Sequence, residues 1–141
     1  MKKLFFLIVP LLIFTVVNAQ NKDQKKVEAQ NVERKIPKDY IADTCKPTVV
    51  MFTATWCAPC RYAKNVVFKE KDVAKELQGY NILIFDVDSK EGKELYNSYC
   101  SKGGKGVSVP TFLFMDKDLN VKDIAGGVDK KEFLLKLKKY K

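Results

Sequence analysis

Two cysteines three positions apart, Cys57 and Cys60, are the residues of this chain best suited to chemistry. They follow an apolar, β-branched run at residues 48–54 and lie where a helix would begin, because Pro59 is tolerated in a first helical turn. The helix dipole, together with the nearby charge of Arg61, favours the thiolate of the first cysteine. The motif therefore indicates redox chemistry, with Cys57 as a solvent-facing nucleophile and Cys60 as the buried resolving thiol.

The same pair could instead be half of a zinc site or a purely structural disulfide. A Cys₄ zinc site usually needs a second Cys-x-x-Cys, whereas Cys45 and Cys100 stand alone. A bridge that closes so short a loop removes little chain entropy. The chain has no histidine, which removes Cys-His nucleophiles, His-containing zinc sites and c-type haem attachment. We therefore favour redox use of the pair and expect no metal and no cofactor.

A proline opens a second apolar run about fifty residues further on. Pro110 precedes residues 111–115, and its missing N–H is tolerable at the first residue or the edge of a strand. The sequence Trp56-Cys57-Ala58-Pro59-Cys60, followed at this distance by a Pro-Thr-led strand, resembles the thioredoxin superfamily from roughly residue 48 to the C-terminus. The resemblance implies a thiol-disulfide oxidoreductase that acts on protein thiols and disulfides.

The resemblance also implies a peptide-binding edge beside the cysteines. In the family this proline is cis and lies against the two sulfur atoms, which leaves the backbone of Val109 free to pair with an extended substrate. Trp56 and Gly126 would rim the groove. The resemblance therefore implies a cis bond before Pro110, where it costs about 0.5–1 kcal/mol against about 3 before other residues.

The chain departs from cytoplasmic thioredoxins at one buried pair. Those proteins carry a carboxylate six residues before the first cysteine and a lysine on the neighbouring strand, and both assist deprotonation of the buried thiol. Met51 and Ile84 stand at the matching positions, so proton transfer must use water or another group, or the buried thiol reacts more slowly. Residues 65–77 look more like exported thioredoxin-like domains, typified by the C-terminal periplasmic domain of DsbD.

The hydrophobic patterning predicts an α/β fold. Residues 48–54 and 82–87 have the composition of strands buried on both faces, and helices are expected after each of them, from about 58 and from about 90 to 99. This order makes a parallel pair with a crossover. The first helix should stop near 69–71, and Asp72 would cap a second piece through residue 77. The side chains expected on one side of the first helix are Tyr62, Ala63, Val66 and Val67.

The C-terminal part is predicted to form a hairpin and a helix. A turn at residues 116–120 separates strands at 111–115 and 121–125, and Asp129 with Glu132 resembles a capping box. We also expect a short helix near residues 39–43 and a flexible loop at 101–106. The patterning thus predicts a thioredoxin-like fold, with a mixed central sheet of four or five strands and helices on both faces.

The N-terminus has the form of a secretory signal. Two lysines precede an apolar core at residues 4–17, and small or branched residues lead to Ala19, so we expect residues 1–19 to be removed. The alternative is an uncleaved anchor, but fourteen residues span about 21 Å as a helix against a bilayer core of about 30 Å. We therefore expect a periplasmic or otherwise exported protein, soluble after cleavage, with a polar linker at residues 20–38 and one domain at 39–141.

Charge and cysteine usage add few constraints on partners. The formal charge of +9 is made of interspersed basic and acidic residues without an arginine or aromatic stripe, so nucleic acid is not an expected partner. We expect a monomer that receives electrons from a membrane thiol transporter.

The functional alternatives are a disulfide-forming oxidase and a redox-inactive peptide-binding scaffold. Export permits a Cys45–Cys100 bridge, but we favour two free thiols.

Overall fold

The computed structural model describes residues 35–101, 107–127 and 129–141, which lie in one compact unit that spans residues 34–141. The expected signal at 1–19, most of the linker at 20–38 and most of the loop at 101–106 lie outside the described residues. In chain order the elements are η2 (Lys38–Tyr40), β1 (Thr48–Thr53), α1 (Ala58–Asn65), η3 (Val67–Lys69), α2 (Lys71–Leu77), β2 (Asn81–Asp86), α3 (Lys90–Cys100), β3 (Thr111–Met115), β4 (Val121–Gly126) and α4 (Lys130–Lys139).

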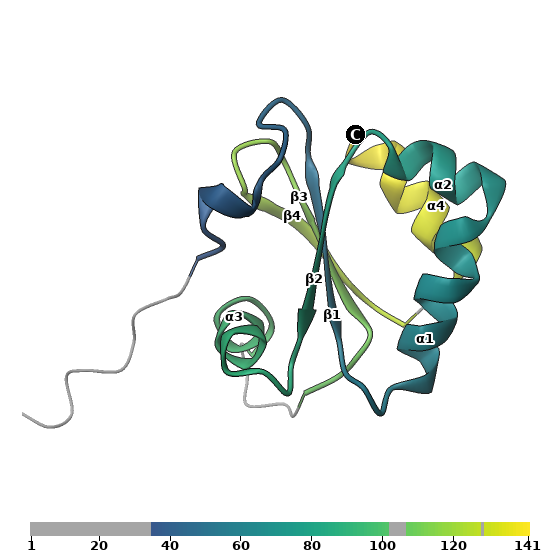
Figure 1. Ribbon diagram of the computed structural model, residues 1–141. Helices are drawn as coiled ribbons and strands as arrows, with labels where there is room; N and C mark the ends of the chain where they lie inside the picture. Colours follow the sequence, from purple (N-terminus) through teal and green to yellow (C-terminus); the bar gives the residue numbers. More distant parts are fainter. Residues whose placement is uncertain (1–34, 102–106, 128) are drawn as a thin grey trace, which may run out of the picture. The chain divides into compact units, whose positions relative to one another are not determined.

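Four strands form one mixed sheet in the order β2-β1-β3-β4. Strand β1 pairs in parallel with β2 and antiparallel with β3, and β3 pairs antiparallel with β4. Helix α3 lies on one face of the sheet, and α1, α2 and α4 lie on the other (Figure 1). The predicted fold class, the parallel crossover and the C-terminal hairpin are therefore confirmed.

The central strand β1 carries the core between the two helical layers. All six of its residues are buried, as expected for a strand with neighbours on both edges and helices on both faces. Phe52 packs edge-on against Tyr96 of α3, with ring centroids 5.3 Å apart. On the other face Phe112 of β3 packs against Phe133 of α4 at 4.9 Å. These aromatic contacts fix each helical layer on the sheet.

Strand β2 is less buried than the sequence suggested. It forms the edge of the described sheet, and Ile84 is 46% exposed. A continuous apolar run therefore marked an edge strand here, because hydrophobicity alone does not reveal which strands have two neighbours.

The inward side of α1 differs from the prediction. Of the four side chains predicted to face inward, Ala63 and Val67 are buried as expected, whereas Tyr62 and Val66 are 54% and 41% exposed. Cys60 is buried as well. The helix ends at Asn65. Over its eight residues only Cys60 and Ala63 are buried, and these two lie three positions apart on the same side of the helix. Helix α2 begins after Glu70 rather than after Asp72, because the backbone carbonyl of Glu70 accepts the first helical hydrogen bond, from Ala74 N–H at 2.8 Å.

The last helix begins as the sequence predicted. The Asp129 carboxylate accepts a hydrogen bond from the backbone N–H of Glu132 at 2.8 Å, and Phe133 and Leu137 are buried.

Ile36, which falls in the expected linker, is 4% exposed and packs in the core, so the packed unit reaches further toward the N-terminus than residue 39. In the described ranges no helix combines the length and apolarity needed to cross a bilayer.

Candidate active site

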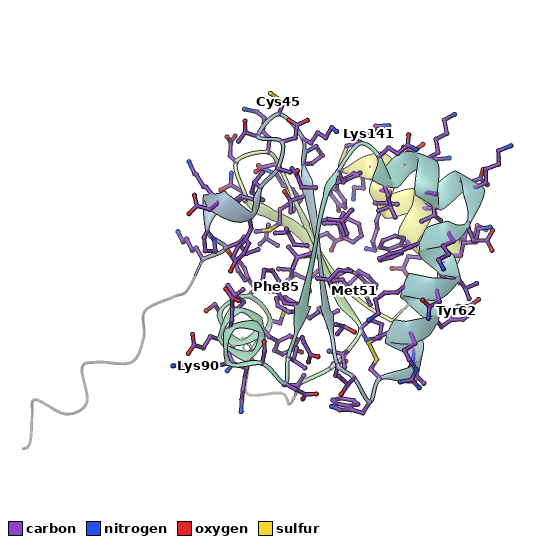
Figure 2. The ribbon with its side chains drawn as sticks, in the orientation of Figure 1. Cys45, Met51, Tyr62, Phe85, Lys90 and Lys141 are labelled. Atoms are coloured by element: carbon purple, nitrogen blue, oxygen red, sulfur yellow. A yellow bond between two sulfur atoms is a disulfide. The ribbon has the colours of Figure 1, made fainter. Side chains whose placement is uncertain are left out.

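Cys57 and Cys60 form a disulfide at the N-terminal end of α1, with Cα atoms 5.3 Å apart (Figure 2). Cys57 is the N-cap residue of this helix, and its sulfur accepts a hydrogen bond from the backbone N–H of Cys60 at 3.1 Å. The expected solvent-facing sulfur is not found in this oxidised state, because Cys57 is 3% exposed and Cys60 is fully buried. Access to the first cysteine therefore differs little from access to the second in this state.

Trp56 stands beside the disulfide as a large exposed ring. It is 62% exposed, and its Nε1 donates a hydrogen bond to the Asp88 carboxylate at 3.3 Å. Asp88 follows the C-terminal end of β2, which lies next to the end of β1 in the parallel pair. Asp88 was not predicted from the sequence, although a polar residue just past a parallel strand is a signal that could have found it.

Arg61 is held by the backbone of the loop before the cysteines. Its Nη1 donates to the carbonyl oxygen of Thr55 at 2.9 Å, and its own backbone N–H bonds the Cys57 carbonyl at 3.2 Å. The guanidinium therefore braces the turn from β1 into α1. The Arg61 side chain is exposed, so solvent and salt screen its charge and limit what it contributes to the sulfur.

Strand register brings Pro110 and Gly126 to the same end of the sheet as the cysteines. Thr111, the residue after Pro110, pairs with Phe52 near the end of β1 and with Gly126 at the end of β4. The Val109–Pro110 bond is cis, as predicted. The backbone N–H of Gly127 donates to the Pro110 carbonyl at 3.0 Å, which ties the end of β4 to the proline.

Tyr96 fixes the other side of the proline segment and was also not predicted from the sequence. Its hydroxyl accepts a hydrogen bond from the backbone N–H of Ser108 at 2.9 Å. The Thr111 hydroxyl donates to the Ser108 carbonyl at 2.6 Å. Val109, between these anchors, is partly buried. A buried tyrosine on a crossover helix gave no sequence signal for this role.

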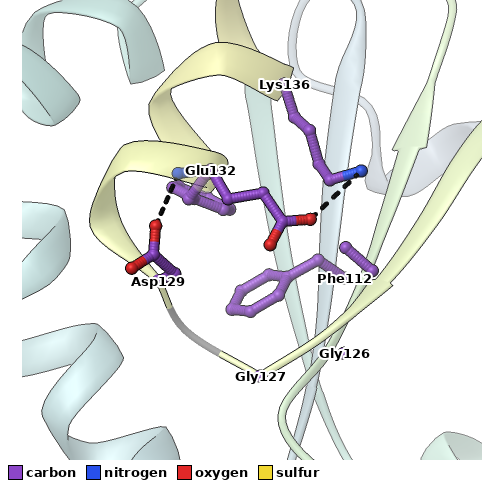
Figure 3. Close-up of a pocket in the computed structure, with 8 residues that line it drawn as sticks. Phe112, Gly126, Gly127, Asp129, Glu132 and Lys136 are labelled. Atoms are coloured by element: carbon purple, nitrogen blue, oxygen red, sulfur yellow. Dashed lines mark hydrogen bonds and ion pairs between the residues drawn. The ribbon is translucent and has the colours of Figure 1, made fainter.

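A hollow opens at the end of β4, where the chain enters α4 (Figure 3). Gly127 has φ +78°, a conformation that disfavours side chains, whereas Gly126 has neither a positive φ nor any atom within 4 Å of the place where a Cβ would stand. The space beside Gly126 is therefore open. The hollow is lined by Phe112, Ala125, Gly126, Gly127, Asp129, Glu132, Phe133 and Lys136.

The pair Met51 and Ile84 occupies matched positions of β1 and β2, as expected from the resemblance. Met51 is fully buried, and neither side chain can exchange a proton with Cys60. Within the described ranges, no cluster of three or more Asp, Glu, His or Cys side chains could hold a metal ion.

The two remaining cysteines are free thiols, in agreement with the favoured prediction. Cys45 is exposed at the end of the sheet away from the disulfide (Figure 2). Burial raises the pKa of the Cys100 thiol to about 11, because the thiolate loses solvation. Cys100 is therefore not an activated nucleophile.

The sequence profile of the thioredoxin-like domain matches residues 37–141, so the chain belongs to the thioredoxin-like family. Thioredoxin H3 of Arabidopsis thaliana is 34% identical over 96 residues, which cover 68% of this chain and 72% of that protein. With the Cys57–Cys60 disulfide, this relationship identifies a thiol-disulfide oxidoreductase.

Three further proteins are similar to this chain. The thiol:disulfide interchange protein DsbD of Campylobacter jejuni is 22% identical over 100 residues, which cover 71% of this chain but 17% of that protein. Among solved structures, the oxidised C-terminal domain of Neisseria meningitidis DsbD gives a TM-score of 0.54 at 21% identity, covering 70% of this chain and 83% of that domain. Fasciola hepatica thioredoxin gives 0.53 at 29% identity, covering 69% and 83%.

Proposed function

We propose that this protein is an exported thiol-disulfide oxidoreductase that reduces or isomerises the disulfides of other proteins. The observation that supports this most strongly is the Cys57–Cys60 disulfide at the start of α1. It lies next to exposed Trp56 and at the same end of the sheet as Pro110. A structural bridge would need neither an exposed aromatic ring nor an open backbone edge next to it.

The reaction begins in the reduced protein. The Cys57 thiolate attacks one sulfur of a substrate disulfide, the substrate S–S bond breaks, and the departing substrate thiolate takes a proton. Cys60 then loses its proton and attacks the Cys57 sulfur, which releases the second substrate thiolate and forms the Cys57–Cys60 disulfide. Two electrons thus pass from the protein dithiol to the substrate. An external dithiol must reduce the protein before the next cycle.

Four features of the chain aid this exchange. The Cys60 N–H that bonds the Cys57 sulfur, together with the positive end of α1, favours negative charge on that sulfur. The Val109 backbone pairs with an extended substrate. Its position is fixed on both sides, because Ser108 is bonded to the Tyr96 hydroxyl and the Pro110 carbonyl is bonded to the Gly127 N–H. Trp56 and Gly126 bound the groove, and Arg61 braces the loop that carries the cysteines.

Export and the electron donor belong to the same proposal. Residues 1–19 act as a cleaved signal and 20–38 as a polar linker, which places a monomeric domain outside the cytoplasm. No soluble nicotinamide pool is expected there, so a membrane thiol transporter supplies the electrons. Similarity to DsbD, a thiol:disulfide interchange protein, supports this assignment. Amino-terminal sequencing of the secreted protein tests export: the proposal expects Gln20 first, and a retained Met1 would contradict it.

Two alternatives make different predictions in a simple assay. A disulfide-forming oxidase would oxidise thiols faster than it reduces insulin, and a redox-inactive scaffold would do neither. We expect catalytic amounts of the protein to accelerate insulin reduction by dithiothreitol. Cys57→Ser should abolish this acceleration, whereas Cys45→Ser, which changes a remote free thiol, should leave it intact. Equal activity of the wild-type protein and Cys57→Ser would contradict the proposal.

A further inference from the structure

Helices α2 and α4 lie side by side and run in the same direction on one face of the sheet. Lys130 bonds Glu70 at 3.0 Å at their N-terminal ends, and Lys141 bonds Glu76 at 3.1 Å at their C-terminal ends. Both helices turn their apolar sides to the sheet, so their outer sides form one continuous surface (Figure 1).

This outer surface carries lysines that form no ion pair with an acidic side chain among the described residues. Several acids on these helices already have partners: Glu70 and Glu76 pair as above, and Glu132 lies 3.6 Å from Lys136, which also pairs with Asp123 at 2.6 Å. The Asp129 carboxylate accepts the N-terminal hydrogen bond of α4 and keeps its charge. The hydrogen bond to Glu70 raises the pKa of Lys130, and the nearby negative charge of Asp72 adds to this rise. We call the exposed lysines of the two helices the basic face: Lys71, Lys75, Lys131, Lys138 and Lys139.

The opposite side of the sheet lacks this excess. Helix α3 begins with two lysines and two glutamates within five residues, Lys90, Glu91, Lys93 and Glu94, so its charge is balanced. Lys90 lies on the far side of the sheet from Lys141 (Figure 2). Of the two helical layers, the one that contains α2 and α4 therefore carries the excess of positive charge.

The chemistry of the basic face favours a diffuse anionic partner. Every basic residue of α2 and α4 is a lysine, a compact point charge, and none is an arginine, which would give planar bidentate recognition of a defined carboxylate. Leu135, 60% exposed, lies on the same stripe as Lys131 and Lys138. Because both helices keep their apolar sides in the core, attraction to an anionic lipid surface rests on the lysines, with Leu135 as an exposed apolar side chain beside them.

We propose that the basic face docks the domain on an anionic membrane surface, with the lysines over lipid phosphates and Leu135 at the headgroup boundary. Trp56 and the disulfide precede α1 at the edge of the sheet and are not part of this face. Docking therefore leaves the redox site accessible to partners in or near the membrane. The inference stands independently of the direction of the redox reaction.

Sedimentation with lipid vesicles tests the proposal on the full chain as isolated from the producing cell. We expect binding to vesicles that contain phosphatidylglycerol, weak binding to pure phosphatidylcholine, and loss of the difference at high salt. Lys131→Gln/Lys138→Gln should weaken the phosphatidylglycerol-dependent binding about tenfold, and Lys71→Gln/Lys75→Gln should act in the same direction. Any contribution of residues 1–34 is common to all variants and cancels in the comparison.

The matched control removes two lysines from the other layer, in Lys90→Gln/Lys93→Gln, and should keep nearly full binding. Equal loss in the α3 and α4 variants would mean that only net charge matters and would overturn the proposal. Binding that ignores lipid charge would overturn it as well. Thermal unfolding and insulin reduction by every variant verify the fold and separate a failure of docking from a failure of the redox function.

Discussion

The hydroxyl of Tyr96 accepts a hydrogen bond from the backbone N–H of Ser108 at 2.9 Å, two residues before Pro110. The ring of Tyr96 packs edge-on against Phe52 of β1. Helix α3 therefore anchors the segment that carries Val109 to the central strand, although it lies across the sheet from α1.

Removal of this hydroxyl should weaken substrate docking. Tyr96→Phe loses one hydrogen bond, which costs about 0.5–1.5 kcal/mol of stability, and loosens the Val109 backbone. We expect KM for a protein disulfide to rise about threefold or more, with little change in the redox potential of the cysteines. Tyr99→Phe is the matched control, because its hydroxyl accepts the Ile36 N–H at 3.1 Å away from the site. A similar rise in KM for both variants would contradict the anchoring role.

Replacement of the buried cysteine should trap substrates. In Cys60→Ser the resolving attack is lost, so mixed disulfides should accumulate on Cys57. Non-reducing gels and mass spectrometry of tryptic peptides would detect the adducts. Cys57→Ser is the control and should trap far less. Preferential adducts on Cys60 in that control would reverse the roles assigned to the two cysteines.

The remaining thiols should differ in reactivity. Burial raises the pKa of Cys100 to about 11, so the fraction of its thiolate stays small until the pH approaches that value, whereas Cys45 is exposed. Iodoacetamide at about pH 8 should label Cys45 first in the folded, oxidised protein. A thiol count after denaturation should give two; a count of zero would show a Cys45–Cys100 bridge instead.

Local patterning was enough to predict β1, the crossover helix, the C-terminal hairpin and the Asp129 cap, because each depends on residues close in sequence. It failed for the partial exposure of β2 and for Tyr62 and Val66, which are exposed although Ala63 and Val67 are buried as predicted. Neighbours far along the chain decide both features. Asp88 and Tyr96 were missed for the same reason: their partners, Trp56 and Ser108, are brought to them by the fold.

The ion pair between Asp123 of β4 and Lys136 of α4 should contribute to stability. Their charged atoms lie 2.6 Å apart, and both side chains are partly buried. The hydrogen bond from Lys136 lowers the pKa of Asp123, so the contribution is complete above the ordinary aspartate pKa of about 4 and is lost as the pH falls through the folded value. Asp123→Asn should therefore lower the free energy of unfolding at pH 7 by about 1 kcal/mol.

Urea unfolding at pH 7 and at about pH 3 would measure this contribution. The difference between wild type and Asp123→Asn should shrink at the lower pH, because the carboxyl of Asp123 takes up a proton in the unfolded state there and the advantage of the charged folded form falls. Asp118→Asn is the control, because Asp118 is 67% exposed and its contact with Lys117 is 3.6 Å long. A pH-independent difference would indicate that the amide disturbs packing rather than charge.

The redox potential of the Cys57/Cys60 pair tests the proposed direction of electron flow most directly. Strongly oxidising relatives stabilise the reduced thiolate, whereas Ala58 and Pro59 bring no charge and Arg61 is bonded to the Thr55 carbonyl. Equilibration in glutathione or dithiothreitol buffers can be followed by the fluorescence of Trp56, the single tryptophan of the chain. We predict a potential of about −200 to −270 mV, and a value above about −150 mV would contradict a reductase and favour an oxidase.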